Sequence, residues 1–485
     1  MQSTISPAPS TAWKAAILAI VVVMAAGCSL TPGYERPAQS LPMLSGSMSP
    51  APTDQDMHTL LSPEELKFLD GLDGSGQLKV LAVRGLQHNR DYAVAVLRVD
   101  QARAEYGLAD ADSLPTLRAG GQVERQHFNN KTLNETYGQR FSAATVGISD
   151  FELDFFGRVK ALSESARHEY LATEFGQQAA RKALIAEVAH RYLFMRAAAS
   201  RQQGADALLV HRKTQLRLAQ KQESAGDISR EELQAVHALQ AQAEQQAEEA
   251  SLQLDKARNA LEHEIGYELA IDTDRQQGPS EAEKPAPIWL ANLTSEHLLQ
   301  RFDVQAAEER LKAANASIGA ARAAFFPSIT LSTSSGIASE HLHDLFSSGT
   351  GTWLFAPQIN IPLFDGGRNQ ANLDLAKVRK EVGIANYEKA IQSAFRDMAD
   401  GLHEREALLQ RARSQSALND IAQEQLVSRQ AQARRGDVSR LDELAAHIQA
   451  VQTEQALLET RLAIQLNLLS LYRVLYGADA SAISS

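Results

Sequence analysis

The stretch "NIPLFDGGRN", residues 360–369, carries an alternating polar and apolar segment into a Gly-Gly-Arg turn, and more than a hundred residues without proline follow it. A close counterpart, "FELDFFGRVK", occupies residues 151–160 and opens a second long run without proline. Alternation is typical of a strand with one wet face, and long proline-free runs rich in Ala, Leu, Gln and Glu are typical of helices. The sequence therefore predicts, twice, a strand that passes through a Gly-Arg turn into a very long helix.

Further segments recur at nearly the same separation along the chain. The anchors at offsets of 210 or 212 residues are Arg158 and Arg368, Gly226 and Gly436, Pro115 and Pro327, Asp91 and Asp303, and Arg98 and Arg310. Because these anchors keep one order and almost one offset, they indicate an internal tandem repeat. Each repeat is expected to hold a short helix, a β-hairpin and two long helices joined by a Gly-Asp turn.

These signals divide the chain into consecutive segments. We expect a signal peptide over 1–27, an N-terminal extended arm and equatorial segment over 28–77, a first repeat over 78–276, a linker over 277–294, a second repeat over 295–477 and a tail over 478–485. In the first repeat the expected elements are a short helix over 78–113, a β-hairpin at about 116–156 and helices at about 158–225 and 227–269. In the second repeat they lie at about 295–325, 328–364, 367–435 and 437–476.

The four strand segments are each about ten residues or longer, which is enough for a tilted strand to cross an outer membrane. Four strands cannot close a barrel, and an open sheet in lipid would leave its edge amides unpaired. If these strands span a membrane, several copies must therefore share one barrel. The expected fold class is mostly α with a transmembrane β-barrel portion. Two soluble hairpins that cap a helical bundle are the alternative.

The last helical segment has apolar residues at alternating spacings of three and four. Its seam is formed by positions 441, 444, 448, 451, 455, 458, 462, 465, 469, 472 and 476, and the matching seam of the first repeat by Leu233, Val236, Gln240, Ala243, Ala247, Ala250, Leu254, Ala257 and Leu261. This spacing predicts coiled-coil packing, in which small alanines let helices approach closely. An ordinary antiparallel coiled-coil bundle would show the same periodicity.

The N-terminus contains Lys14, an apolar run over 15–26 and then Ala-Gly-Cys. The run is too short to cross a bilayer stably and fits the core of a signal peptide. Cys28, the only cysteine of the chain, stands where a lipoprotein signal peptidase would cut and lipid would be attached. Ser29 after it favours sorting to the outer membrane. A plain signal peptide with an incidental cysteine is the alternative.

Several function classes are disfavoured. The net charge is −11 and no cluster of Lys and Arg is present, so nucleic acid is not an expected partner. The 13 histidines are scattered without a metal-ligand spacing such as HExxH, and there is no nucleophile motif of the Gly-x-Ser-x-Gly type. We therefore expect no metal, no cofactor and no enzymatic activity.

Together these motifs resemble the TolC-type outer-membrane efflux channels, in the lipoprotein branch that serves multidrug and metal efflux pumps (the OprM, CusC and NodT group). The resemblance is carried by Cys28, "TPGYERP" (31–37), the two Gly-Arg motifs, and the turn motifs "AGDISREEL" (225–233) and "RGDVSRLDEL" (435–444). It covers essentially the whole mature chain. The family's prolines near the short helices are absent, where this chain reads Asn89-Arg90-Asp91 and Arg301-Phe302-Asp303.

The resemblance implies a homotrimer in the outer membrane, lipid-anchored at Cys28. Three chains would each give four strands to a 12-stranded β-barrel, which a long periplasmic α-barrel of coiled-coil helices continues. The strand-to-helix junctions would be Gly157, Arg158, Gly366, Gly367 and Arg368. Glycine permits unusual backbone angles there, and Arg can bond exposed backbone carbonyls. Asp227 and Asp437 are expected to cap the returning helices.

The implied function is that of a passive channel subunit in a tripartite efflux system for small toxic solutes. Its implied partners are a periplasmic membrane-fusion adaptor and an inner-membrane pump, of the RND type. Adaptor docking is expected at the helical tips, through Gly226, Asp227, Leu233, Gly436, Asp437 and Leu444. A periplasmic gate is expected at Glu232, Asp442 and Arg440. The alternatives are a type I secretion conduit for polypeptides and a non-pore periplasmic coiled-coil scaffold.

Overall fold

The computed structural model describes residues 30–36, 52–137, 139–266 and 295–475. The expected signal peptide with Cys28, the linker over 277–294 and the tail over 478–485 lie outside the described residues. The chain divides into two units between Ser47 and Met48, and every helix and strand below belongs to the second unit.

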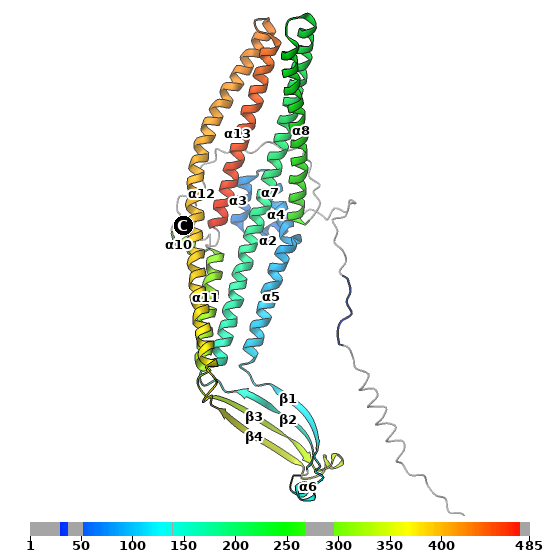
Figure 1. Cartoon of the computed structure of the whole chain (residues 1–485), viewed down its shortest axis with the longest axis vertical. Coiled ribbons are helices and arrows are strands. Elements are labelled where there is room, and N and C mark those ends of the chain that lie inside the picture. The colour runs from blue at the N-terminus through cyan, green and yellow to red at the C-terminus, as the bar shows by residue number, and fades with distance from the viewer. Residues whose placement is uncertain (1–29, 37–51, 138, 267–294, 476–485) are drawn as a thin grey trace, which may run out of the picture. The chain divides into compact units, whose positions relative to one another are not determined.

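Four long helices dominate this unit (Figure 1). They are α7 (Arg158–Ala225) and α12 (Arg368–Arg435), with 68 residues each, and α8 (Arg230–Ile265) and α13 (Arg440–Leu475), with 36 residues each. Figure 1 shows α7 turning back into α8, and α12 into α13, at the end remote from the sheet. The expected seam positions up to 472 that the structure describes on α8 and α13 are buried or half-buried, as coiled-coil packing requires, and position 476 lies outside the described residues.

The expected short helices are each two helices. The first is α4 (Gln77–His88) followed by α5 (Arg90–Ala111), and the second is α10 (Ser295–Leu299) followed by α11 (Phe302–Ala323). Asn89 makes the first break: its backbone is extended, and its side-chain oxygen accepts the Tyr92 N–H at 2.8 Å, which caps α5. The prediction of one continuous helix over 78–113 was wrong because this capping residue inside the periodic run was overlooked, and the second helix breaks at Arg301, which makes no side-chain cap.

The arm expected to be extended contains helices as well. Helix α2 (Asp54–Leu60) begins after Thr53 and α3 (Pro63–Leu72) after Ser62, and each has a capping box. In the expected loops between strands, α6 (Lys131–Tyr137) and the 3-10 helix η2 (Leu342–Asp344) are further short elements.

The strands form one antiparallel sheet in the order β1-β2-β3-β4. Their bounds are β1 (Leu117–Arg125), β2 (Arg140–Glu152), β3 (Ser328–Ser339) and β4 (Gly351–Asn360). A bulge between Ile148 and Phe151 shifts the pairing of β2 with β3, and Asp150 within it has a φ of 55°. Strands β1 and β4 are the two edges of the sheet in the single chain.

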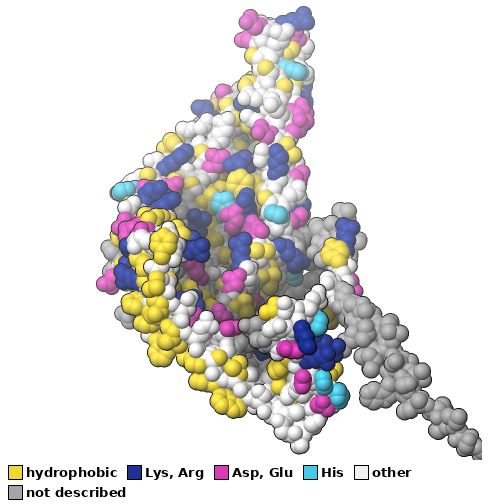
Figure 2. Space-filling model, turned by 60° about the horizontal axis from the view of Figure 1, so that its bottom comes forward, with side chains coloured by type: hydrophobic (Ala, Val, Ile, Leu, Met, Phe, Trp, Pro, Cys, Tyr) yellow, Lys and Arg dark blue, Asp and Glu magenta, His cyan; other side chains and the backbone are white. Residues whose placement is uncertain are grey.

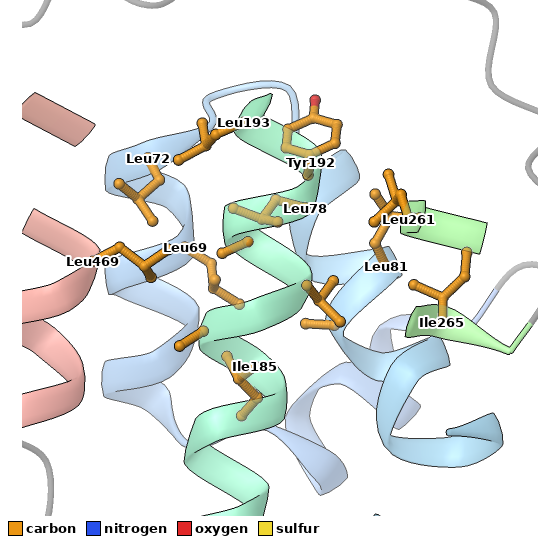
Figure 3. Packing of buried hydrophobic residues seen from close by; sticks show 14 of the residues in the cluster. Leu69, Leu72, Leu78, Leu81, Ile185, Tyr192, Leu193, Leu261, Ile265 and Leu469 are labelled. Carbon is orange, nitrogen blue, oxygen red and sulfur yellow. The ribbon is translucent and has the colours of Figure 1, made fainter. Parts of the chain in front are cut away.

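The largest apolar core lies where α3, α4, α7, α8 and α13 meet. Figure 3 shows Leu69 and Leu72 of α3, Leu78 and Leu81 of α4, Ile185, Tyr192 and Leu193 of α7, Leu261 and Ile265 of α8, and Leu469 of α13 pointing toward one another. This core joins the N-terminal helices to helices of both halves of the chain. Within the described residues no helix combines the length and apolar character needed to cross a membrane.

Candidate functional site: sheet, junctions and tips

The sheet has one apolar and one polar face. Side chains of paired residues share a face, and successive residues alternate between faces, so the register assigns each side chain. The apolar face carries Leu117, Val123, Val146, Ile148, Ile329, Leu331, Ile337, Trp353, Phe355 and Ile359. The polar face carries mainly polar side chains, with Phe141 and Leu354 as its large apolar ones; the polar side chains are Arg118, Gln122, Glu124, Thr145, Thr330, Ser332, Ser334, Gln358 and Asn360. Trp353 is 78% exposed and Ile359 63% exposed, so the apolar face is uncovered in the single chain.

Two glycines bring the central strands close together on the polar face. A Cβ atom on Gly147 would lie 2.1 Å from the carbonyl oxygen of Thr333, and one on Gly336 would lie 2.1 Å from that of Ala144. Any side chain at either position would collide with the backbone of the neighbouring strand. Glycine there lets β2 and β3 bend toward the polar face, which is the curvature a barrel with a polar interior requires.

At the first junction the chain leaves β2 and enters α7 through Gly157, whose φ is +75°. The Arg158 guanidinium bonds the Glu152 carboxylate twice, with Nε–Oε1 at 2.8 Å and Nη2–Oε2 at 2.5 Å. It was expected to bond backbone carbonyls; the nearby carboxylate is the stronger, bidentate partner. The helix N-terminus is satisfied by Asp154, which accepts the Lys160 N–H at 2.8 Å.

At the second junction β4 leads to α12 through Gly366 and Gly367, with φ of +66° and +86°. Asp365 accepts the N–H groups of Gly367 at 2.9 Å and Asn369 at 2.8 Å. Among the described contacts, Arg368 takes part through its backbone N–H, which donates to the Asp365 carbonyl at 3.4 Å, rather than through its side chain as expected. Sequence reasoning overlooked Asp154 and Asp365, although an Asp two or three residues before the turn glycine is a recognisable capping signal.

Exposed phenylalanines surround the two junctions. They are Phe155, Phe156, Phe325, Phe326 and Phe364. The rings of Phe156 and Phe326 stack with their centroids 4.8 Å apart, which joins the start of α7 to the end of α11. Aromatic side chains in a band of this kind suit the boundary between lipid and water.

The helical tips have the same backbone geometry in both halves. Gly226 (φ +84°) and Gly436 (φ +81°) end α7 and α12, and the following Asp227 and Asp437 donate their N–H groups to the carbonyls of Gln222 and Gln432, at 2.8 and 3.0 Å. These are Schellman-type ends, in which a left-handed residue is needed and glycine has no Cβ penalty. The glycines therefore have the turn role expected of them.

The returning helices are capped by serines, not by the aspartates expected from the sequence. Ser229 Oγ accepts the Glu232 N–H at 3.2 Å, and Ser439 Oγ accepts the Asp442 N–H at 3.1 Å. The aspartates cannot cap because they still belong to the preceding turn, two residues before the serine. The Asp437 carboxylate instead lies 3.0 Å from Arg435 Nε.

The three residues expected at a gate do not pair with one another. The Glu232 carboxylate accepts the Ser229 N–H at 2.7 Å and Asp442 accepts that of Ser439 at 3.1 Å, which completes each cap. Bonds from these serines hold the pKa of both exposed carboxyls below the ordinary value. Arg440 bonds Glu443 at 2.5 Å and not Asp442. Of the tip leucines, Leu233 is half-buried and Leu444 is buried.

No group of three or more His, Cys, Asp and Glu side chains within the described residues is arranged to hold a metal ion.

Comparison with known proteins agrees with this architecture. A family model described as "Outer membrane efflux protein" matches residues 81–267 and 293–476. The chain is 36% identical over 464 residues to the cation efflux system protein CusC of Escherichia coli K12, covering 94% of this chain and 98% of CusC. It is 34% identical over 480 residues to the probable outer membrane lipoprotein SilC of Salmonella typhimurium, covering 96% and 99%.

A solved structure gives the same result for the fold. The open state of the MtrE outer membrane channel of Neisseria gonorrhoeae superimposes with a TM-score of 0.73 at 32% identity, covering 92% of this chain and 98% of MtrE. The match to the family model over both halves, and the near-complete coverage of these relatives, lead to one conclusion. The chain belongs to the outer membrane efflux protein family, the TolC-type channels.

Proposed function

We propose that this chain is the outer-membrane channel subunit of a tripartite efflux system, which passively conducts small toxic solutes from a periplasmic pump and adaptor to the exterior. The observation that carries this proposal is the sheet, with an uncovered apolar face, a polar face and two open edges. The apolar face suits lipid and the polar face suits a water-filled lumen. Residues 1–27 are its signal peptide, and Cys28 is its lipid anchor.

We infer that the functional unit is a homotrimer, in which three chains close one 12-stranded barrel. Unpaired edges are costly in hydrocarbon, so β4 of one chain must pair with β1 of the next. A head-to-tail contact of this kind closes into a ring. The number three rests on the family resemblance.

The helices next to the sheet support the same closure. Helix α5 packs on α7, α7 on α11 and α11 on α12, so α5 and α12 are the edges of this layer, like β1 and β4. Both edge helices expose apolar side chains at helical spacing: Val94, Leu97 and Leu108 on α5, and Leu375, Val378 and Val382 on α12. These two apolar stripes can cover each other in a ring of chains, which would continue the barrel as a periplasmic α-barrel.

The equal lengths of α7 and α12, and of α8 and α13, support an internal tandem repeat.

In the tripartite system, an inner-membrane pump of the RND type supplies the energy for transport. An adaptor docks at the tips through Gly226, Asp227, Leu233, Gly436, Asp437 and Leu444. Glu232, Asp442 and Arg440 lie beside the same tips, where a periplasmic gate would close.

Single-channel recording of the purified protein in planar bilayers tests the pore. We expect discrete conductance steps from a trimer. A monomer without conductance would favour the coiled-coil scaffold instead. Expression with a pump and adaptor in a strain lacking its own outer-membrane channel separates the other alternative: restored resistance to small toxic compounds indicates efflux, and release of a polypeptide indicates a type I secretion conduit.

A further inference from the structure

Two arginines face each other at the end of the sheet that is remote from the helices. Arg125 is the last residue of β1 and Arg140 the first of β2, and the register places them directly opposite each other. Both side chains are exposed. Figure 2, in which the sheet end comes forward, shows Lys and Arg side chains gathered at this end beside His and acidic ones.

This pairing is unfavourable in the chain alone. Directly opposite residues of an antiparallel pair have Cβ atoms about 5 Å apart, and like charges there repel. The nearest acid on β1, Glu124, belongs to the other face and accepts a hydrogen bond from Gln122 at 3.4 Å. Among the described residues, no hydrogen bond or ion pair joins either guanidinium to an acid. Neither guanidinium therefore forms an ion pair with an acid of the described residues.

The pair lies on the apolar face, in line with Leu117, Ala119, Gly121 and Val123 of β1. The eight steps between successive residues from Leu117 to Arg125 span roughly 27 Å of antiparallel strand, or about 19 Å of height at a tilt near 45°. The apolar band of outer-membrane barrels is about 25 Å tall. The junctions lie at the helical end of the sheet, so Leu117 is on the junction side and Arg125 is at the opposite end of β1, where the proposed barrel would meet the outer lipid headgroups.

We propose that Arg125 and Arg140 form a binding site for the phosphate group of an anionic lipid in the outer leaflet. The inference rests on the proposed function, which turns the apolar face toward lipid. A guanidinium binds phosphate through two parallel N–H donors, and two forks that converge on one phosphate would replace their mutual repulsion with attraction. Sequence reasoning missed the pair because it depends on the register of β1 with β2.

Native mass spectrometry of the purified full-length protein, titrated with bisphosphorylated lipid A, tests the site. Basic residues near an anionic membrane surface each contribute a modest binding energy, so replacing both arginines should weaken lipid A retention about thirtyfold. The variant is Arg125→Gln with Arg140→Gln. The matched control is Arg118→Gln, on the same strand but on the polar face, and it should retain lipid A as the unmodified chain does.

Three outcomes would overturn the site: unchanged retention by the double variant, an equal loss in the Arg118→Gln control, or equal retention of lipid A that lacks its phosphates. Complete displacement by millimolar inorganic phosphate would assign the pair to a soluble anion instead. Conductance of the same preparations keeps the two proposals separate. If the double variant conducts normally but loses the lipid, both stand; if the unmodified protein conducts and the lipid result is negative, this inference alone fails.

Discussion

Glu65 shows how a single residue can hold several elements together. Its side chain is fully buried, and Oε1 lies 2.6 Å from Arg181 Nη1 and 2.7 Å from Lys182 Nζ on α7. Oε2 accepts the Ser62 N–H at 2.8 Å and so caps α3. Burial would raise the pKa of this carboxyl, but the hydrogen bonds and charges of Arg181 and Lys182 outweigh burial and lower it to about 2.

Replacing Glu65 with Gln should therefore release α3 from α7. The change removes the buried carboxylate that pairs with the half-buried Arg181 and Lys182, and breaking a pair of this kind costs roughly 3–5 kcal/mol. Hydrogen exchange over residues 54–72 should rise strongly. Asp70→Asn, which breaks the more exposed pair with Lys79, is the control and should have little effect. Equal exchange in the two variants would contradict the role given to Glu65.

The same carboxylate predicts resistance to acid. Its pKa is depressed in the folded chain, so its stabilisation is fully present above the unfolded value near 4.5 and is lost as pH falls toward about 2. Residues 54–72 should stay protected from hydrogen exchange, corrected for intrinsic rates, down to pH 4 and should lose protection between pH 4 and 2. In Glu65→Gln this pH dependence should be absent. Loss of protection between pH 6 and 5 in the unmodified chain would contradict this assignment.

The tip caps provide a second test at single residues. Ser439→Ala removes the hydroxyl that accepts an amide of the first turn of α13, and should destabilise that turn by about 1 kcal/mol. Asp437→Ala removes only an exposed contact with Arg435 and should change little. Hydrogen exchange over residues 440–446 measures both. A larger effect from Asp437 would reinstate the aspartate as the cap.

Sequence patterns located the ends of these helices but not the groups that satisfy them. Gly-Asp-x-Ser offers two good capping side chains, and both are compatible with the spacing. The choice depends on how many residues the left-handed turn consumes, which is a backbone property. The same limit applied to Arg158, whose partner Glu152 lies six residues away across a glycine turn.

At the scale of elements, α7 and α13 make polar contacts on the tip side of the apolar core that they share. Gln455 of α13 donates a hydrogen bond to the Ser200 carbonyl of α7 at 3.2 Å. A Cβ atom on Gly204 of α7 would lie 2.2 Å from Nε2 of Gln455, so the glutamine packs directly against this glycine. Toward the tips the rings of His211 and His447 stack at 4.8 Å. The seam of α13 was predictable from its spacing, but not that its glutamine would pack against α7, because periodicity gives a face and not a partner.

The histidine contact should loosen in acid. Burial, then the charges of His447 and Arg440, lower the pKa of His211, so folding favours its neutral form. The acid that faces the histidine pair is Glu443, whose carboxylate lies 4.0 Å from His447 and bonds Arg440. The neutral amide of Gln430 also contacts His447. The stabilisation is present above pH 6.5 and is lost as pH falls below it.

Hydrogen exchange across residues 205–215 and 443–450, corrected for intrinsic rates, should therefore increase between pH 7.5 and 5. His447→Gln should flatten this dependence, whereas His237→Gln, an exposed histidine on α8, should leave it unchanged. An identical pH profile in His447→Gln and the unmodified chain would refute the contact's role.

For the whole molecule, assembly should depend on the apolar edge of α12. Val378 and Val382 are more than half exposed and lie one helical turn apart. Changing both to Glu would put two charges into the proposed contact between chains and should shift the detergent-solubilised protein from trimer to monomer. Light scattering after size exclusion measures this. Lys377→Glu, exposed on the same turn, is the control. A trimeric double variant would rule out this edge as the contact.

The four strands and the glycines of the Gly-Arg turns were predictable because each leaves a local pattern in the sequence. The polar and apolar faces of the sheet were not, because the bulge at Asp150 and the register of β2 decide which residues share a face. The expected single short helices failed for a similar reason. Asn89 and Arg301 interrupt a periodicity that continues on both sides of them.

The matched helix lengths have a consequence for how such chains can change over time. Each residue inserted into a helix advances its far end by about 1.5 Å, so one heptad added to both arms of the first hairpin would lift that tip by roughly 10 Å above the other. A partner that grips both tips at once would then meet an uneven rim. Insertions and deletions in these helices should therefore be retained only when both hairpins change by the same number of residues. Changes of length in the loops between strands, which do not set the height of either tip, should be tolerated.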